Sequence, residues 1–423
     1  MPDHVRIRMY NVGFGNCFLL EFPRGEGVPA RILVDCGAHT AGYPKPGWKP
    51  ADTAKQIVAD ITEDSSAAAI DVVVASHRHQ DHVSGFAARE WSTVTVDQVW
   101  LPWTEDPHDP RATDIRNRQS RLALGLQLAF SQDQFAQPWE KPEIVESLRS
   151  LAVNNLTNEA AMRTLHRGFL GHPTRQYLSA AAEVTVPECP ELKVHVLGPS
   201  RQPGVIREMD PPRGASYLQF QARADGGEVV SEAGMRATSA FAKQFSLAPQ
   251  QFETDPATQA QTLSVEIKNA AAGVMSEENI AVAVALEKAV NGTSLMLMFE
   301  FRDAFLLFPG DAQWGTWNAA LTDPITRDLL SRTTFYKVGH HGSHNATPME
   351  FVEQVLDPAR KIWGAAASVH PIKMLPEIPR APLLEALGKH ADRVVRSDEP
   401  GAGDEGLVVR GGGSIGVDFH VPC

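Results

Sequence analysis

Residues 76–85 place three histidines and one aspartate within six positions, directly after the apolar run at 71–75. That β-branched run predicts a buried strand, and side chains just past its end have a rigid support that still reaches solvent. In extended backbone His77 and His79 point the same way, whereas Asp81 and His82 follow on a turn and face a second position nearby. Neutral imidazole is the commonest metal ligand. We therefore interpret the four side chains as ligands for two ions, and not as a polar loop with incidental histidines.

The length of 423 residues exceeds that of one ordinary compact domain, so we expect two domains or one domain enlarged by insertions. A net charge of −12 argues against a surface that binds a polyanion over its whole extent, although a local basic groove is compatible with it. Residues 1–8 alternate charged and apolar side chains, unlike a signal peptide, and no window has the character of a membrane span. These features predict a cytoplasmic protein that does not enter a membrane.

The four cysteines are widely separated in the sequence. Cys17, Cys36, Cys189 and Cys423 show none of the close pairing that marks a cysteine metal site. Their spacing favours reduced thiols in a cytosol over a disulfide framework.

The first hundred residues are predicted to contain several strands and a helix. Alternation at 5–10 and the apolar run at 17–20 predict a hairpin, and further strands are predicted at 30–34 and 96–102, with a helix at 53–62. Asp35 ends the strand at 30–34, where a carboxylate can orient a neighbouring ligand, although an ordinary turn aspartate is the alternative.

Two stretches interrupt this pattern. From 104 the composition becomes polar and proline-bearing, and a helical region is expected to about 181, so that 104–191 forms a helical insertion; a second, partly helical insertion is expected at 200–285. The first contains Arg111, Arg116, Arg118 and Arg121. They can receive a phosphate-bearing substrate, but a solvated helix face paired with nearby acids is the interpretation that we favour.

The remaining strands end in further candidate ligands. Strands are predicted at 192–198, 293–301 and 304–308, the last followed by Asp311, whose carboxylate has two oxygens and can bridge two cations. Another apolar strand ends at His340 and His341. His195 lies in the middle of its strand, where a packed or hydrogen-bonded histidine is commoner than a ligand.

Together these segments resemble the metallo-β-lactamase fold superfamily, whose His-x-His-x-Asp-His signature is matched at 77–82. More narrowly, residues 12–16, 33–37, 309–311 and 337–343 look like the hydrolase domain of ComEC-type DNA-uptake proteins and their soluble relatives. The resemblance covers roughly 4–103 and 192–420. It implies an α/β (α+β) fold, a four-layer αββα sandwich in which 1–103 and 192–423 form the hydrolase domain.

The resemblance also implies two divalent ions, usually zinc and sometimes manganese. The implied metal ligands are His77, His79, Asp81, His82, Asp311 and His341. Asp311 would contact both ions, with His77 and His79 on one of them and the other three ligands on the second. His340 would touch the scissile group or donate a proton, so the residues expected to act in catalysis are Asp81, His340 and Asp35.

In one place the sequence departs from the wider superfamily. No Gly-His-Thr segment supplies a further histidine before Asp311, and residues 291–294 stand in the matching place. Water, Asn291 or Ser294 would then complete the coordination of the first ion. Ser343, His344 and Asn345 would read the substrate, or cap a following helix.

These features support three hypotheses. The first is a metal-dependent phosphodiesterase or nuclease acting on a phosphoester such as a nucleotide or nucleic acid. The second is a metallohydrolase of another ester, a lactone, a thioester or an amide. The third is a non-catalytic interaction protein with the same fold. The acidic balance favours short nucleotides over long nucleic acids.

Overall fold

The structure, a computed structural model, describes residues 4–25, 27–63, 67–131, 158–212, 215–217, 288–343, 347–356, 361–372 and 378–423. The chain forms two compact units. One, here called the main unit, contains residues 1–116, 157–218 and 289–423. The other contains 117–156 and 219–288, most of which lie outside the described residues.

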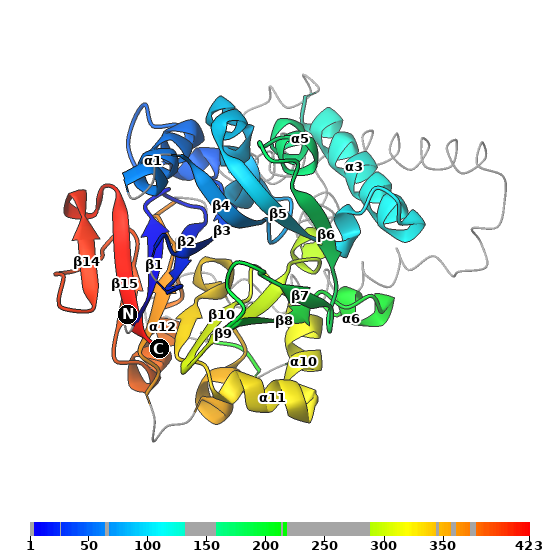
Figure 1. Ribbon diagram of the computed structural model, residues 1–423. Coiled ribbons are helices and arrows are strands. Elements are labelled where there is room, and N and C mark those ends of the chain that lie inside the picture. The colour runs from blue at the N-terminus through cyan, green and yellow to red at the C-terminus, as the bar shows by residue number, and fades with distance from the viewer. Residues whose placement is uncertain are drawn as a thin grey trace, which may run out of the picture. The chain divides into compact units, whose positions relative to one another are not determined.

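The main unit contains two β-sheets (Figure 1). In spatial order, the first sheet consists of β14 (Leu407–Arg410), β15 (Gly416–Pro422), β1 (His4–Tyr10), β2 (Cys17–Phe22), β3 (Ala30–Cys36), β4 (Ala69–Val74), β5 (Thr95–Pro102) and β6 (Thr174–Leu178). The second consists of β13 (Val394–Arg396), β12 (Gly364–Ala367), β11 (Phe335–Lys337), β10 (Ala304–Phe308), β9 (Met296–Phe301), β8 (Leu192–Gly198) and β7 (Glu183–Thr185).

Each sheet has an antiparallel part and a parallel part. In the first sheet β15, β1, β2 and β3 pair antiparallel, whereas β3, β4, β5 and β6 run parallel. In the second sheet β10, β11, β12 and β13 run parallel. The carboxyl ends of parallel strands meet at one edge of a sheet, which is the usual place for a site in such folds.

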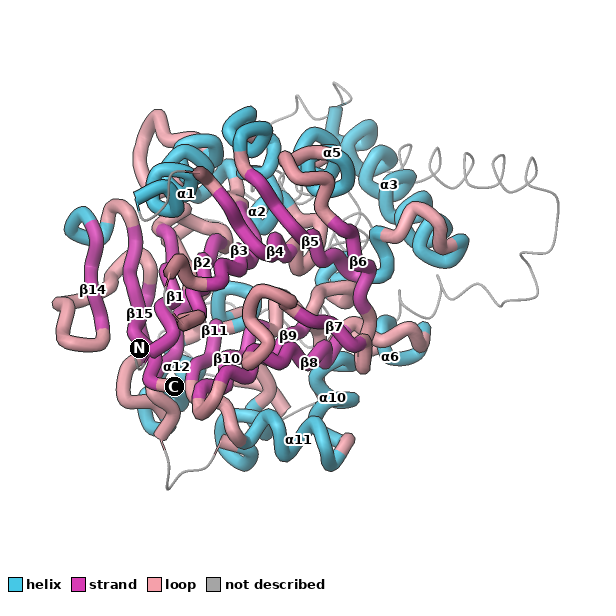
Figure 2. Tube along the Cα trace, viewed as in Figure 1, coloured by secondary structure: helices cyan, strands magenta, loops and turns pink. Residues whose placement is uncertain are grey.

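The described chain also contains helices (Figure 2). The helices of the described chain are α1 (Pro50–Glu63), α2 (Gln80–Val83), α3 (Pro110–Ser131), α5 (Glu159–Arg167), α6 (Pro203–Arg207), α10 (Trp314–Thr322), α11 (Pro324–Ser331) and α12 (Ala381–His390). None of them combines the length and the hydrophobicity that a membrane-spanning segment needs.

Three hydrophobic clusters connect these elements. One cluster joins the facing sides of the two sheets, where Phe18 of β2 contacts Phe308 of β10 with ring centroids 5.5 Å apart. A second joins the other side of the first sheet to α1 and α5. The third joins the other side of the second sheet to α10, α11 and α12. The main unit is therefore a mixed α/β structure with two sheets and helices.

The strands expected at 5–10, 17–20, 30–34, 96–102, 192–198 and 304–308 are confirmed with shifts of at most two residues at an end, and the helix at 53–62 lies within α1. The strand expected at 293–301 begins later, at Met296. His195 is hydrogen-bonded as expected, because its Nε2 lies 2.7 Å from Glu300 Oε2.

The predicted continuation of the helical region to residue 181 is wrong. β6 pairs with β5 in parallel, and β7 pairs with β8, so both strands belong to the sheets. β6 carries Arg175 and Gln176 on the outer strand of its sheet, and polar residues there hide the alternation that reveals a strand. The insertion expected at 200–285 lies mainly outside the described residues.

All four cysteines are free thiols, as the sequence predicts. Cys17 and Cys36 face each other in the register of β2 and β3. Burial raises the pKa of the Cys17 thiol well above its usual value, which disfavours the reactive thiolate.

Candidate metal centre

Five strand ends meet at the candidate metal centre. Asp35 lies at the end of β3, and residues 77–82 follow β4 in the same sheet. In the second sheet Asp311 follows β10, and His340 and His341 follow β11. Ser368 follows β12. The chain thus brings the candidate ligands to the carboxyl ends of its parallel strands, where they are held by buried backbone.

Four of the predicted ligands form a compact buried group. Ligand atoms of Asp81, His82, Asp311 and His341 all lie within 4.8 Å of one another. The Nε2 atom of His341 is 2.9 Å from Asp81 Oδ2, and the Nε2 atom of His82 is 3.3 Å from Asp311 Oδ2. Tetrahedral coordination with bonds of about 2.0–2.1 Å separates ligand atoms by roughly 3.3 Å. The group therefore has the spacing that one small divalent cation requires.

His77 and His79 lie beside this group. The Nε2 atom of His77 is 3.0 Å from Nδ1 of His79, which agrees with the expectation that both point the same way. The ring centroid of His77 is 4.0 Å from that of His82. Both side chains are buried. The two imidazoles lie beside His82, outside the group of four whose ligand atoms are within 4.8 Å of one another.

Groups behind the ligands fix the orientation of two imidazoles. Asp35 Oδ2 accepts a hydrogen bond from His82 Nδ1 at 2.7 Å, and the carboxylate also accepts from the backbone N and the hydroxyl of Ser76, both at 2.7 Å. The Nδ1 atom of His341 donates to the carbonyl oxygen of Ser368 at 2.7 Å. In both imidazoles Nε2 is thereby directed toward the carboxylates, which is the usual arrangement behind histidine ligands.

The electrostatic environment keeps the carboxylates ionised. Burial opposes their ionisation, yet His82 and His341 hold the pKa of Asp81 well below its usual value, and His82 and His340 do the same for Asp311. Burial alone would lower the pKa of His82, but the nearby carboxylates of Asp311, Asp35 and Asp81 outweigh it and raise the pKa to about 10. The protonated imidazole of His82 and the neighbouring carboxylates therefore offset the cost of burying each other's charge.

The pKa values of His77 and His79 are lowered, unlike that of His82. Burial lowers the pKa of His79 to about 4, and burial together with His82 and His79 lowers the pKa of His77 well below its usual value. Neutral imidazole is the form that binds a metal. Both side chains are therefore ready to act as ligands at neutral pH.

Two buried oxygens next to the group of four ligands have no hydrogen-bond partner among the described residues. They are Oδ1 of Asp81 and Oδ1 of Asn16. The Nδ2 atom of Asn16 lies 3.0 Å from His82 Nε2. A buried carboxylate oxygen without a partner is costly, and a cation would satisfy it. The side chains present thus fit a divalent cation.

His340 occupies a different environment from His341. Its side chain is 20% exposed, its Nε2 lies 3.8 Å from Asp311 Oδ2, and burial lowers its pKa. Its ring is held by Ser343, whose Oγ lies 2.8 Å from Nδ1, and by Asn291, whose Nδ2 lies 3.4 Å from Nε2. Among the pair, His341 has the geometry of a ligand, and His340 faces the more accessible side.

The five predicted substrate contacts lie in different environments. Ser294 is fully buried, and its hydroxyl has no hydrogen-bond partner among the described residues. His344 and Asn345 lie outside the described residues. Of the five, the structure therefore brings Asn291 and Ser343 to His340.

The backbone at the centre is strained. Asp35, His340 and His341 all have positive φ, at 59°, 42° and 52°. Positive φ is uncommon outside glycine, and such residues persist where surrounding contacts enforce them. Gly310, with φ 56°, precedes Asp311, and a Cβ there would lie 2.9 Å from the carbonyl oxygen of Leu295. The side chains of the candidate centre are therefore held by backbone conformations that non-glycine residues rarely adopt.

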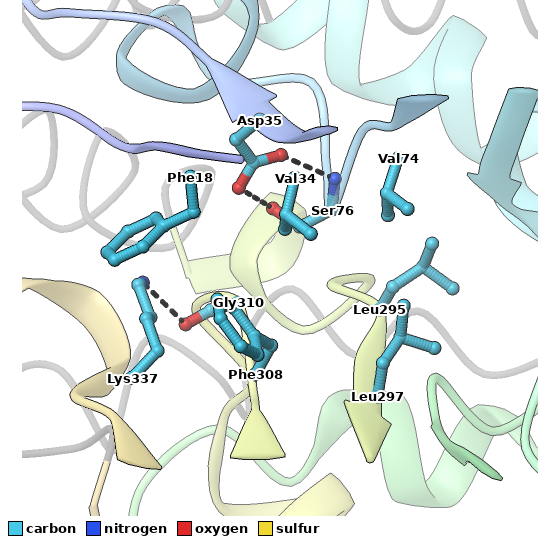
Figure 3. Close-up of a pocket in the computed structure, with 10 residues that line it drawn as sticks. All are labelled: Phe18, Val34, Asp35, Val74, Ser76, Leu295, Leu297, Phe308, Gly310 and Lys337. Carbon is cyan, nitrogen blue, oxygen red and sulfur yellow. Dashed lines mark hydrogen bonds between the residues drawn. The ribbon is translucent and has the colours of Figure 1, made fainter. Parts of the chain in front are cut away.

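A small cavity of about 10 Å³ lies between the sheets at this end (Figure 3). Asp35, Ser76 and Lys337 form its polar wall, and the remainder is largely apolar. Lys337 Nζ lies 3.4 Å from the carbonyl oxygen of Gly310 and 3.8 Å from Asp311 Oδ1. Burial lowers the pKa of Lys337, while Asp311 opposes the shift. Lys337 therefore places a basic group beside the Asp311 carboxylate, on its cavity side.

Sequence reasoning missed several of these supporting groups. Ser76 directly precedes His77, Lys337 lies in the strand predicted before His340, and Ser368 follows β12, which was not predicted from the sequence. The positions of Ser76 and Lys337 close to predicted ligands were a signal for a supporting role, but serine and lysine are common at strand ends. Phe14 was missed too, although its ring packs 4.1 Å from that of His341.

No protein-family model matches the chain, and no curated protein matches it.

Proposed function

We propose that this protein is a dinuclear metal-dependent hydrolase, and specifically a phosphodiesterase or nuclease. The observation that carries the proposal is the buried group of Asp81, His82, Asp311 and His341, with ligand atoms within 4.8 Å. The neighbouring pair His77 and His79 supplies the nitrogens for a second ion. Zinc suits a mixed set of imidazole and carboxylate ligands, and manganese is the alternative.

The arrangement of the main unit supports the same proposal. Its hydrophobic clusters follow the order helices, sheet, sheet, helices, which agrees with a four-layer αββα sandwich of the metallo-β-lactamase type. The resemblance to the hydrolase domain of ComEC-type proteins depends on sequence motifs that lie at this centre. Likeness of fold alone does not define a reaction, so the site chemistry is the stronger support.

Divalent ions held here would lower the pKa of a coordinated water and neutralise negative charge on a phosphoryl group. Asp311 belongs to the group of four, and its carboxylate, which has two oxygens, would serve a second ion as well. Asp35 keeps His82 oriented through the hydrogen bond to Nδ1. The partly exposed His340 can donate a proton to a leaving oxygen or hydrogen-bond to the phosphoryl group.

Metal content and hydrolysis of bis(p-nitrophenyl) phosphate test the proposal together. We expect close to two ions per chain by elemental analysis, and Asp81→Ala to lose more than about 100-fold in activity, since even changes behind a ligand cost about 10–100-fold. Asp303→Ala is the control, because Asp303 is exposed in the turn between β9 and β10.

The other hypotheses give different results. Bound metal without phosphodiester hydrolysis would favour an ester, lactone, thioester or amide as substrate. A chain that binds no metal when metal is supplied would favour a non-catalytic interaction protein. Equal activity of Asp81→Ala and the wild type would refute the proposed centre.

A further inference from the structure

A pocket of about 610 Å³ lies next to the loop that carries the first two histidines. Arg78, between His77 and His79 in the sequence, forms part of its wall. Three more arginines line it, Arg116 near the start of α3 and Arg163 and Arg167 on α5, together with Glu105 and Glu159. All of these residues belong to the main unit.

Within this pocket Glu105 is already neutralised. Nε and Nη2 of Arg78 donate to Glu105 Oε1 and Oε2 at 2.9 and 2.8 Å, a bidentate ion pair. Glu105 is buried, and Arg78 holds its pKa below the usual value despite that burial. Asn158 Nδ2 donates to the backbone carbonyl of Arg78, so this wall is rigid. The pair leaves the other arginines to determine the charge of the pocket.

Those arginines face only one further acid of the pocket, Glu159. The guanidinium of Arg116 donates to the backbone carbonyls of Thr104 and Asp106, and the carboxylates of Glu105 and Asp106 attract it without forming an ion pair with it in the described part of the chain. Arg163 and Arg167 are exposed on α5, and neither forms an ion pair within the described part of the chain. The pocket thus carries excess positive charge in a chain whose net charge is −12.

A solvated helix face explains this arrangement less well. Arg163 and Arg167 are four positions apart, so they lie on the same side of α5, where like charges destabilise a helix. They also border a concave pocket and not a convex surface. An anion between them would remove the repulsion, and the planar guanidinium group suits two parallel hydrogen bonds to phosphate.

We propose that this pocket is a phosphate-binding subsite that takes a second phosphate of the substrate while the first is held at the metal centre. The inference rests on the proposed function, because the loop with Arg78 also carries two predicted ligands. It limits the substrate class to phosphodiesters that carry another phosphate nearby, such as short oligonucleotides. Of the arginines singled out in the sequence at 111–121, only Arg116 lines the pocket.

Calorimetric titration of the purified protein tests the inference. The probes are phosphorothioate-linked dithymidine with and without a 5′-phosphate, since that linkage keeps its negative charge and resists hydrolysis. We expect the 5′-phosphate to raise the affinity about tenfold or more, and the double variant R163A/R167A to lose that gain. Thermal unfolding of the variant checks that it is folded, as expected for two exposed side chains.

The matched control is R89A/R111A, which removes two exposed arginines that do not line the pocket. It should keep the preference within about twofold. Absence of a preference in the wild type, or an equal preference in R163A/R167A, would overturn the inference. The proposed reaction is tested apart from this, because failure to hydrolyse bis(p-nitrophenyl) phosphate would leave the binding result unaffected.

Discussion

At the residue scale, the Asp35 carboxylate connects two residues of the candidate centre, the ligand His82 and Ser76. It accepts hydrogen bonds from His82 Nδ1 and from both the backbone and the hydroxyl of Ser76. The hydroxyl oxygen of Ser76 in turn lies 3.2 Å from His77 Nδ1. Through Asp35 and Ser76 the orientations of a ligand from each predicted ion site therefore depend on one another.

We predict that Asp35→Asn weakens zinc binding by about 10–100-fold, because an amide cannot accept these hydrogen bonds with the charge that His82 requires. Competition with a fluorescent zinc chelator measures the affinity. Asp303→Asn, in an exposed turn, serves as the control and should bind zinc as the wild type does. If the two variants bind alike, Asp35 is the ordinary turn aspartate that sequence alone also allows.

At the element scale, the site is built where strands of both sheets end. β4 and β11 could be predicted from apolar runs that stop at histidines, and β10 from the run before Asp311. β12 could not, because its sequence Gly-Ala-Ala-Ala has little β propensity and becomes a strand only between β11 and β13. Ser368 follows β12, so its bond to His341 was equally hidden.

The residues of the candidate site likewise differ in whether the sequence predicts them. Ligand types and spacing are local in the sequence, and they predicted His77, His79, Asp81 and His82. Contacts across the sheets are set by packing between distant segments, such as that of Lys337 with Asp311. No local pattern encodes them, and the arginine pocket beside α5 was hidden for the same reason.

Close approach of β3 and α2 gives the element-scale prediction. Gly37 follows β3, and a Cβ there would lie 2.5 Å from the backbone N of both His82 and Val83. Gly37→Ala should therefore displace the ligand segment and cost about 1–3 kcal/mol of stability, as overpacking does, with weaker zinc binding. Urea unfolding and zinc titration measure the two effects.

Gly388→Ala provides the comparison, since a Cβ at this position of α12 meets nothing within 4 Å. It should leave zinc binding unchanged and stabilise the helix by up to about 1 kcal/mol. A Gly37→Ala protein as stable as the wild type would show that β3 and α2 can move apart freely.

At the scale of the molecule, the first and last strands of the main unit lie side by side. β1 pairs with β15 from His4, opposite Pro422, to Tyr10, opposite Gly416 (Figure 1). The buried Arg8 of β1 donates to Asp418 of β15 at 2.6 and 2.7 Å, and its Nη1 lies 2.7 Å from Asp60 of α1. This ion network joins both chain ends to the first helix.

We predict that Arg8→Ala destabilises the protein by about 3–5 kcal/mol, because it leaves the buried carboxylates of Asp60 and Asp418 with only the more distant Arg410, at 3.5 and 3.9 Å. Lys193→Ala removes a cation from a pair whose lysine is 68% exposed, and it should cost less than about 1 kcal/mol. Equilibrium unfolding in urea compares the two. Similar losses would mean that the buried network contributes no more than a surface pair.

Metal removal measures how much a bound ion would stabilise the folded main unit against unfolding. The proposed ligands come from the segment after β4, from Asp311 and from His341, so a bound ion stabilises only the folded arrangement that brings these segments together. Zinc at a thousand times its dissociation constant should add about 4 kcal/mol to the free energy of unfolding. Urea unfolding with zinc and with a chelator measures the difference, and Asp81→Ala should lose most of it. Identical curves for the wild type in zinc and in chelator would mean that the six side chains form a buried polar network without a metal.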